Sequence, residues 1–379
     1  MNSQFSLFDT LILLGIIQGI IISFLLLITK RNTQSNRFLA LGLLSFCLLS
    51  TKPLLHTQLL WETHYFRYFP NALELAVAPL LFFYVKALFT PKFQFKRKYW
   101  LHFLPLFISQ AYAFIVYFVT LQARDISTKK TIANHLFFDE VKQLDEYILL
   151  LATLLYLYQG FGLIKDYKHW LNNTTSDTKL PDFKWMRHLF ILFSFTGLII
   201  LIGRVFAFIN LFNAIWFVEY FWRFVNLYTA FLIYYLGLKG YFQPNYVFPE
   251  KPNRVKTSVL DVDQDYIENY QKIERSMVED KLFLETQISL QKLAQHLSLP
   301  QREISNIINH HFKTNFRDFI NHYRIEEVKV KLKEPSNSNK SIFGIASECG
   351  FNSETSFYRL FKKHVGVTPK KFLDQSTTH

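Results

Sequence analysis

Hydrophobic residues are distributed in two different ways along this chain. In the first two thirds they form runs close to the ~20 residues that a helix needs to cross a bilayer. The runs cover residues 5–29, 38–58, 70–89, 100–121, 144–164, 189–210 and 215–238. After residue 286, hydrophobic positions instead recur every three or four residues between turn signals, which is typical of short amphipathic helices. The pattern predicts an all-α protein with a seven-helix transmembrane domain (1–240), a connector (241–286) and a helical carboxyl-terminal domain (287–379).

Composition supports lipid as the environment of the first domain. Half of the residues are hydrophobic and 41 are phenylalanine, more than a soluble core needs. Only Cys47 and Cys349 are present, so neither a disulfide framework nor a thiolate metal site is expected. The chain has no HExxH pair and no GxSxG turn. We therefore expect no metal, no cofactor and no enzymatic activity.

The distribution of basic residues predicts the topology. The first run has no basic residue before it and is followed by Lys30 and Arg31, which predicts an uncleaved helix with its amino end outside. The loops that then fall on the inner side are richer in lysine and arginine than the outer loops. Seven crossings place the carboxyl-terminal domain in the cytoplasm. Tryptophan and tyrosine near the ends of the runs favour an interfacial belt over an aromatic binding cage.

Four of the charged residues within the apolar runs are singled out because they are predicted to lie at membrane depth. They are Glu74, Arg204, Glu219 and Arg223. Glu219 and Arg223 are one helical turn apart and can neutralise each other or share Arg204. Two interpretations stay open: a ligand or ion site used for sensing, and a purely structural ion pair.

The connector begins with Pro244, Pro249 and Pro252, which end the last membrane helix. Residues 265–285 then form an amphipathic segment with one apolar seam. The seam consists of Tyr266, Tyr270, Ile273 and Met277. It predicts either a coiled coil that joins two copies through 265–285 or a helix packed on the next domain. Because fewer than about three heptads are present, packing is favoured.

The carboxyl-terminal domain contains the same helical unit twice. Ala294 lies on the apolar face of a first short helix, and a second helix starts near Pro300. After a longer helix that ends before Pro335, the pattern recurs around Gly350 and a second amphipathic helix capped by Ser353. Two helix-turn-helix units joined by a rigid helix fit successive major grooves about 34 Å apart. Their basic outer face fits phosphate, so double-stranded DNA is the expected partner.

Individual positions in this domain resemble a known family. They are Leu293-Ala294, Ile304-Ser305, Ile308-Asn309, Phe316, Phe319-Ile320-Asn321, Tyr323-Arg324-Ile325, Ile345-Ala346, Gly350-Phe351, Ser353, Phe357, Arg359, Phe361-Lys362, Gly366, Thr368-Pro369 and Phe372. The run from Ser289 to Phe372 is similar to the AraC/XylS family of transcription regulators. With its membrane helices, the arrangement resembles the membrane-integrated AraC-type regulators of Bacteroidota. The chain departs from the family at Ser298 and Lys313, where glycine is frequent.

The resemblance implies roles for exposed residues of the two recognition helices. It implies base contacts by Arg302, Ser305, Asn306, Asn309, Glu354, Thr355, Tyr358 and Arg359. Contacts with the phosphate backbone are expected from Lys313, Lys362, Lys363, Lys370 and Lys371. For each of these predicted base contacts, a phosphate contact or plain solvent exposure is an alternative that stays open.

Together these observations predict a sequence-specific DNA-binding transcription regulator in the inner membrane of a bacterium. Its bundle is expected to sense a small molecule or an envelope signal. One alternative is a membrane carrier or sensor whose tail is a protein docking module. Another is a bundle that serves only as a membrane anchor.

Overall fold

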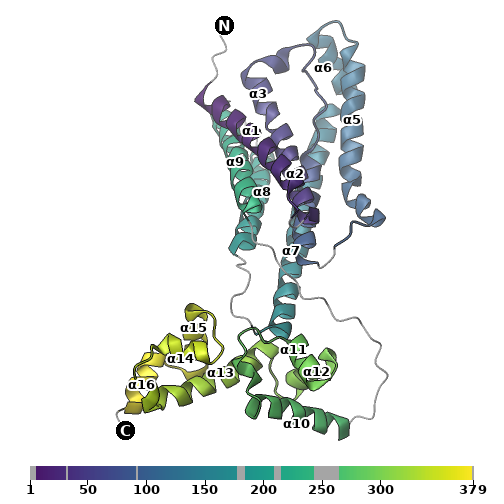
Figure 1. Ribbon diagram of the computed structural model, residues 1–379. Coiled ribbons are helices and arrows are strands. Elements are labelled where there is room, and N and C mark those ends of the chain that lie inside the picture. The colour runs from purple at the N-terminus through teal and green to yellow at the C-terminus, as the bar shows by residue number, and fades with distance from the viewer. Residues whose placement is uncertain are drawn as a thin grey trace. The chain divides into compact units, whose positions relative to one another are not determined.

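The computed structural model describes residues 6–30, 33–90, 93–176, 184–208, 215–242 and 264–377. These residues are helical apart from turns, loops and one isolated antiparallel bridge between Thr175 and Ser289 (Figure 1). Contacts divide the chain into unit 1, residues 1–164 and 182–249, and unit 2, residues 165–181 and 250–379. Residues 165–181 therefore group with the carboxyl-terminal unit, whereas the sequence-based division assigned them to the membrane domain. The predicted boundaries at 240 and 286 stay predictions.

Unit 1 contains a helix at each of the predicted apolar runs. Its helices are α1 (Leu7–Ile28), α2 (Thr33–Leu49), α3 (Thr51–Thr57), α4 (Glu74–Phe89), α5 (Leu104–Leu121), α6 (Ile126–His135), most of α7 (Phe138–Thr174), α8 (Lys184–Phe208) and α9 (Ile215–Tyr241), with short 3₁₀ turns at Leu60–Glu62 and Arg97–Phe103. Among the described residues, four segments are long and apolar enough to cross a membrane: Leu7–Ile28, Gln34–Thr57, Arg97–Leu121 and Phe138–Thr174. The count of seven spans stays a prediction.

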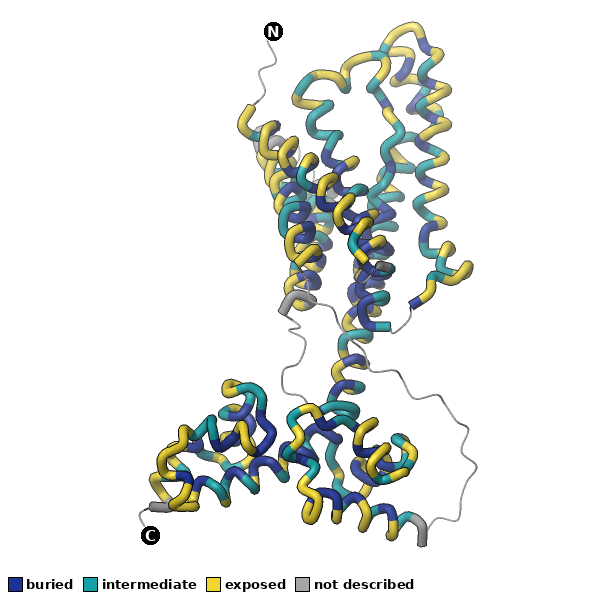
Figure 2. The backbone as a smooth tube through the Cα atoms, viewed as in Figure 1, coloured by how far each residue is buried: buried dark blue, intermediate teal, exposed yellow. Residues whose placement is uncertain are grey.

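The packing of unit 1 leaves large apolar side chains on its outside. α1 contacts α2 and α9, and α2 contacts α4. At Gly19 the helices are so close that a Cβ would collide with Cys47 and Ile233. Phe24 of α1 is 63% exposed and Ile108 of α5 is 62% exposed. Figure 2 shows exposed positions along much of both helices. Helices that are hydrophobic on every side are typical of membrane spans.

Unit 2 has two hydrophobic cores that share one long helix. It contains α10 (Gln264–Val278), α11 (Leu290–Leu297), α12 (Gln301–His310), α13 (Phe316–Lys333), α14 (Ile342–Glu348), α15 (Glu354–Val365) and α16 (Pro369–Thr377), with 3₁₀ turns at Leu282–Leu284 and Pro335–Asn337. The first half of α13 contributes Phe319 and Ile320 to the core with α11 and α12. Its second half contributes Val328 and Leu332 to the core with α14 and α15. Because one helix contributes to both cores, it links the two helix-turn-helix units.

The connector helix α10 packs on the first of these cores. Ile273 and Met277 are fully buried there, with Tyr266 and Tyr270 against the edge. This is the packing interpretation that the sequence favoured. Ile267 is 56% exposed, so α10 keeps an apolar residue outside the seam. Pairing of two copies through 265–285 stays a prediction.

Candidate nucleic-acid interface

The first helix-turn-helix unit is formed by α11 and α12. Ser289 caps α11 by accepting a 3.3 Å hydrogen bond from the Lys292 amide. The turn is made by Ser298, whose φ of 54° lies in the left-handed region. The amide of Leu299 then donates to the Ala294 carbonyl at 3.1 Å. This backbone pattern ends a helix sharply, so α12 can start at once on a new axis.

The helix α12 presents a polar face to solvent because its other face is fully buried. Ile304, Ile307 and Ile308 are 0% exposed in the first core. On the other side, Arg302, Asn306 and Asn309 are exposed and Ser305 is half-buried. The Asn309 amide donates to the Ser305 hydroxyl at 3.3 Å, so these two residues share one face. All four predicted base-contacting residues of this helix are therefore at least partly exposed.

The second unit, α14 and α15, repeats the turn with a glycine. Gly350 has φ 90°, and the amide of Phe351 donates to the Ala346 carbonyl at 3.1 Å, as Leu299 does to Ala294. A Cβ on Gly350 would lie 2.8 Å from Arg324 Nε and 2.9 Å from two carbonyl oxygens. Glycine is therefore required both by the backbone angle and by space. Ser353 caps α15, as the sequence predicted.

The helix α15 is amphipathic in the same way. Phe357, Leu360 and Phe361 are buried in the second core. Glu354, Thr355 and Arg359 are exposed, whereas Tyr358 is half-buried and packs against that core. Tyr358 was expected to be exposed, and its ring instead lies 5.3 Å from that of Phe357. Only part of its side chain can face a partner.

The lysines predicted to contact phosphate all lie on the surface. Lys313, Lys362, Lys363, Lys370 and Lys371 are exposed. Lys363 Nζ lies 3.6 Å from Asp318 on α13, so part of its charge is neutralised. For comparison, Lys340 donates to Glu348 at 2.6 Å and thereby lowers the pKa of that carboxyl group. The other four predicted lysines form no ion pair within the described part of the chain.

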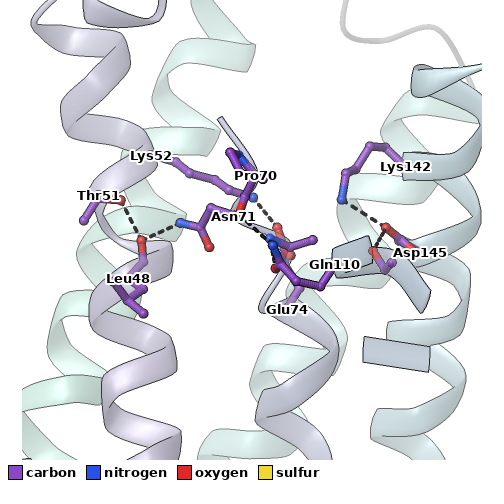
Figure 3. A network of polar contacts seen from close by, with 11 residues as sticks. Leu48, Thr51, Lys52, Pro70, Asn71, Glu74, Gln110, Lys142 and Asp145 are labelled. Atoms are coloured by element: carbon purple, nitrogen blue, oxygen red, sulfur yellow. Dashed lines mark hydrogen bonds and ion pairs between the residues drawn. The ribbon is translucent and has the colours of Figure 1, made fainter. Parts of the chain in front are cut away.

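Among the charged residues singled out in the apolar runs, Glu74 has a partner that was not predicted from the sequence. Glu74, at the start of α4, forms an ion pair with Lys52 of α3. Figure 3 shows that pair beside Asn71 and Gln110, whose amide donates to the Pro70 carbonyl at 2.8 Å. Arg223 is exposed. The side chains of Arg204 and Glu219 lie outside the described residues, so their pairing stays a prediction.

Sequence reasoning did not single out several charged residues of unit 1. Lys52 lies inside an apolar run and pairs with Glu74. Asp9 is 2% exposed and accepts a 2.7 Å hydrogen bond from Thr57. Asp145 accepts from Ser109 at 2.5 Å. It also accepts from Lys142 at 3.0 Å (Figure 3). Each lies within or at the edge of an apolar run, which was the signal available in the sequence.

Comparisons with known proteins match the helix-turn-helix region. A family model described as a helix-turn-helix domain matches residues 293–375, from α11 to α16. The melibiose operon regulatory protein of Escherichia coli strain K12 is 29% identical over 85 residues, which are 22% of this chain and 27% of that protein. The Proteus vulgaris protein named Probable transcription factor PqrA is 35% identical over 75 residues, 18% of this chain and 59% of that protein. No solved structure matches.

These matches confirm an AraC-type helix-turn-helix domain at the carboxyl terminus, as the resemblance predicted. They cover about a quarter of the length of the melibiose regulator, and 59% of the length of PqrA. The four segments that are long and apolar enough to cross a membrane lie outside the residues that the family model matches.

Proposed function

We propose that this chain is a membrane-embedded, sequence-specific DNA-binding transcription regulator whose helical bundle acts as its sensor. The observation that carries the proposal is the pair of helix-turn-helix units on α13, each with a buried apolar face and an exposed polar one. α13 has 18 residues and is therefore about 27 Å long. Recognition helices held at its two ends suit neighbouring major grooves, which are about 34 Å apart.

The expected division of labour follows from the exposed side chains. Arg302 and Arg359 are suited to guanine, Asn306 to adenine and Glu354 to cytosine, because their donors and acceptors match those base edges. Lysines at the ends of α12, α15 and α16 are suited to phosphate. The names of the relatives, an operon regulatory protein and a transcription factor, support regulation rather than enzymatic catalysis.

The four apolar segments and the basic residues of the inner loops support a place in the bacterial inner membrane. In that topology the amino terminus is outside and the helix-turn-helix domain is in the cytoplasm. Fusion of a reporter enzyme to each terminus tests this arrangement. If a reporter that works only outside the cytoplasm is active at the carboxyl terminus, the proposal is contradicted.

DNA recognition is tested with the full chain in lipid nanodiscs and a randomised pool of duplex DNA. We expect enrichment of one sequence and an affinity that falls steeply with salt. Arg302→Ala and Arg359→Ala should each lower the affinity for that sequence about 5- to 150-fold, equivalent to ~1–3 kcal/mol. The matched control is Lys272→Ala, which removes one positive charge from α10, where Lys272 pairs with Glu268 at 2.7 Å. If no sequence is enriched from the pool, the alternative that the tail is a protein docking module is favoured.

The sensing role needs its own experiment. The bundle is replaced by an unrelated single membrane helix, and expression from the selected DNA site is measured across growth conditions. We expect regulation by growth conditions to be lost. Unchanged regulation would mean that the bundle is only an anchor.

A further inference from the structure

The end of α7 belongs to the carboxyl-terminal unit. The predicted span ends at Ile164, and the residues of unit 2 begin at Lys165, inside the same unbroken helix. A helix of 37 residues is about 55 Å long, well beyond the ~30 Å hydrocarbon core. Beyond Lys165 the helix is amphipathic, with Tyr167 and Leu171 each 5% exposed and Lys165, Asp166, Lys168 and His169 exposed. We call residues 165–176 the α7 extension.

The α7 extension forms backbone contacts at the entrance of the first helix-turn-helix unit. Thr175 and Ser289 form an antiparallel bridge. The amide and the hydroxyl of Ser176 both donate to the Ile288 carbonyl, at 3.3 Å and 2.7 Å. Ser289 is also the residue that caps α11. The extension is therefore attached where the first unit begins.

A polar face of α13 forms the other side of this contact. Arg317, Asn321 and Arg324 are spaced four and three residues apart, so they share one side of the helix, and they are 9%, 0% and 1% exposed. Arg317 donates from Nη1 to the Asn172 side chain at 3.1 Å and from Nε to the Thr175 carbonyl at 3.2 Å. Buried guanidinium groups need such partners because their desolvation is costly. For Arg317 the α7 extension supplies them.

Arg324 connects the same contact to both helix-turn-helix units. Its Nη2 lies 3.4 Å from the Ser176 hydroxyl and 2.7 Å from the Glu285 carbonyl, before the first unit. Its guanidinium lies 5.8 Å from the centre of the Phe351 ring, in the turn of the second unit. A shift of the α7 extension would therefore disturb the contacts of Arg324 both at the start of the first unit and at the turn of the second unit.

We propose that the polar face of α13 is a docking surface for the α7 extension, and that this docking fixes the placement of the two recognition helices. The inference rests on the proposed function. It makes α7, rather than the connector 241–286 alone, the route by which the membrane domain acts on DNA binding. Movement of α7 along its axis changes the docking, and undocking releases the geometry that fits two major grooves.

The docking is tested by a disulfide in the full chain in nanodiscs. Residues paired in an antiparallel bridge have Cα atoms roughly 4.5–5.5 Å apart, within disulfide range. Thr175→Cys with Ser289→Cys should therefore cross-link readily under mild oxidation, and neither single variant should do so. Adding Arg317→Ala or Asn172→Ala should slow cross-linking about tenfold, because each removes a hydrogen bond of a charged group. Lys329→Ala, on α13 but paired with Glu326 at 2.7 Å, is the matched control and should change nothing. If the disulfide between positions 175 and 289 does not form, the proposed docking is wrong.

The regulatory role is tested on the selected DNA site with the same proteins. Asn172 lies outside the helix-turn-helix cores. Because undocking releases the geometry that fits two major grooves, Asn172→Ala should lower the affinity for the two-groove site at least threefold. The oxidised protein with Thr175→Cys and Ser289→Cys should resist that loss. Affinities unchanged by Asn172→Ala, with normal binding by the parent protein, overturn this inference alone. Absence of sequence-specific binding by every variant, the parent included, overturns the proposed function and the regulatory role with it.

Discussion

Replacement of Ser298 by glycine should stabilise the first helix-turn-helix unit. Ser298 has φ 54° and ψ 34°, a left-handed conformation that costs an L-residue roughly 1–2 kcal/mol. Glycine does not have this cost, but it loses about 0.5–1 kcal/mol more conformational entropy on folding. The balance favours Ser298→Gly by about 0.5–1 kcal/mol. Ser298→Ala keeps the strain and serves as the control.

Hydrogen exchange of the full chain, followed by mass spectrometry, measures this difference. Amides of α11 and α12 exchange through opening of the first unit, so a gain of 0.5–1 kcal/mol should slow them about two- to fivefold. Amides of α15, which belong to the second core, should respond less. If the glycine variant exchanges as fast as the alanine variant, the strain attributed to Ser298 is absent and the reasoning is refuted.

Two further predictions concern charge and burial in unit 2. Lys370→Ala combined with Lys371→Ala should reduce the magnitude of the slope of log affinity against log salt by about 1.8, because each phosphate contact contributes roughly 0.9. Binding titrations at several salt concentrations measure this slope. An unchanged slope would show that neither lysine contacts phosphate. Cys349 is 0% exposed, and this burial raises the pKa of its thiol to about 12. Alkylation of Cys349 at pH 8 should therefore be far slower than alkylation of a small thiol in solution. Mass spectrometry of the labelled peptide checks this, and rapid labelling of the folded protein contradicts it.

The helix-turn-helix units could be predicted because their signals are local. Three-to-four periodicity in 290–308 and 342–361 marks the buried faces, and the exposed faces follow from it. Gly350 and Ser353 mark a turn and a cap by their own chemistry. The apolar runs likewise located the helices of unit 1, because length and hydropathy are properties of single segments.

Contacts between distant segments could not be predicted in this way. Arg317 and Asn172 are 145 residues apart, and in the sequence Arg317 looks like an exposed basic residue near a helix start. Lys52 and Glu74 are each conspicuous in apolar runs, yet nothing local in the sequence indicates that they pair. The left-handed angle at Ser298 does not follow from its residue type, and it was indicated only by the glycine that is frequent at this position in the family the domain resembles.

The sequence by itself determined the all-helical class, the location of the apolar helices and the repeated recognition unit, since each depends on neighbouring residues alone. The tertiary structure decided that the end of α7 and the arginines of α13 share one buried contact. The physical reason is that a buried charge needs a hydrogen-bonding partner, and folding can bring that partner from any point in the chain.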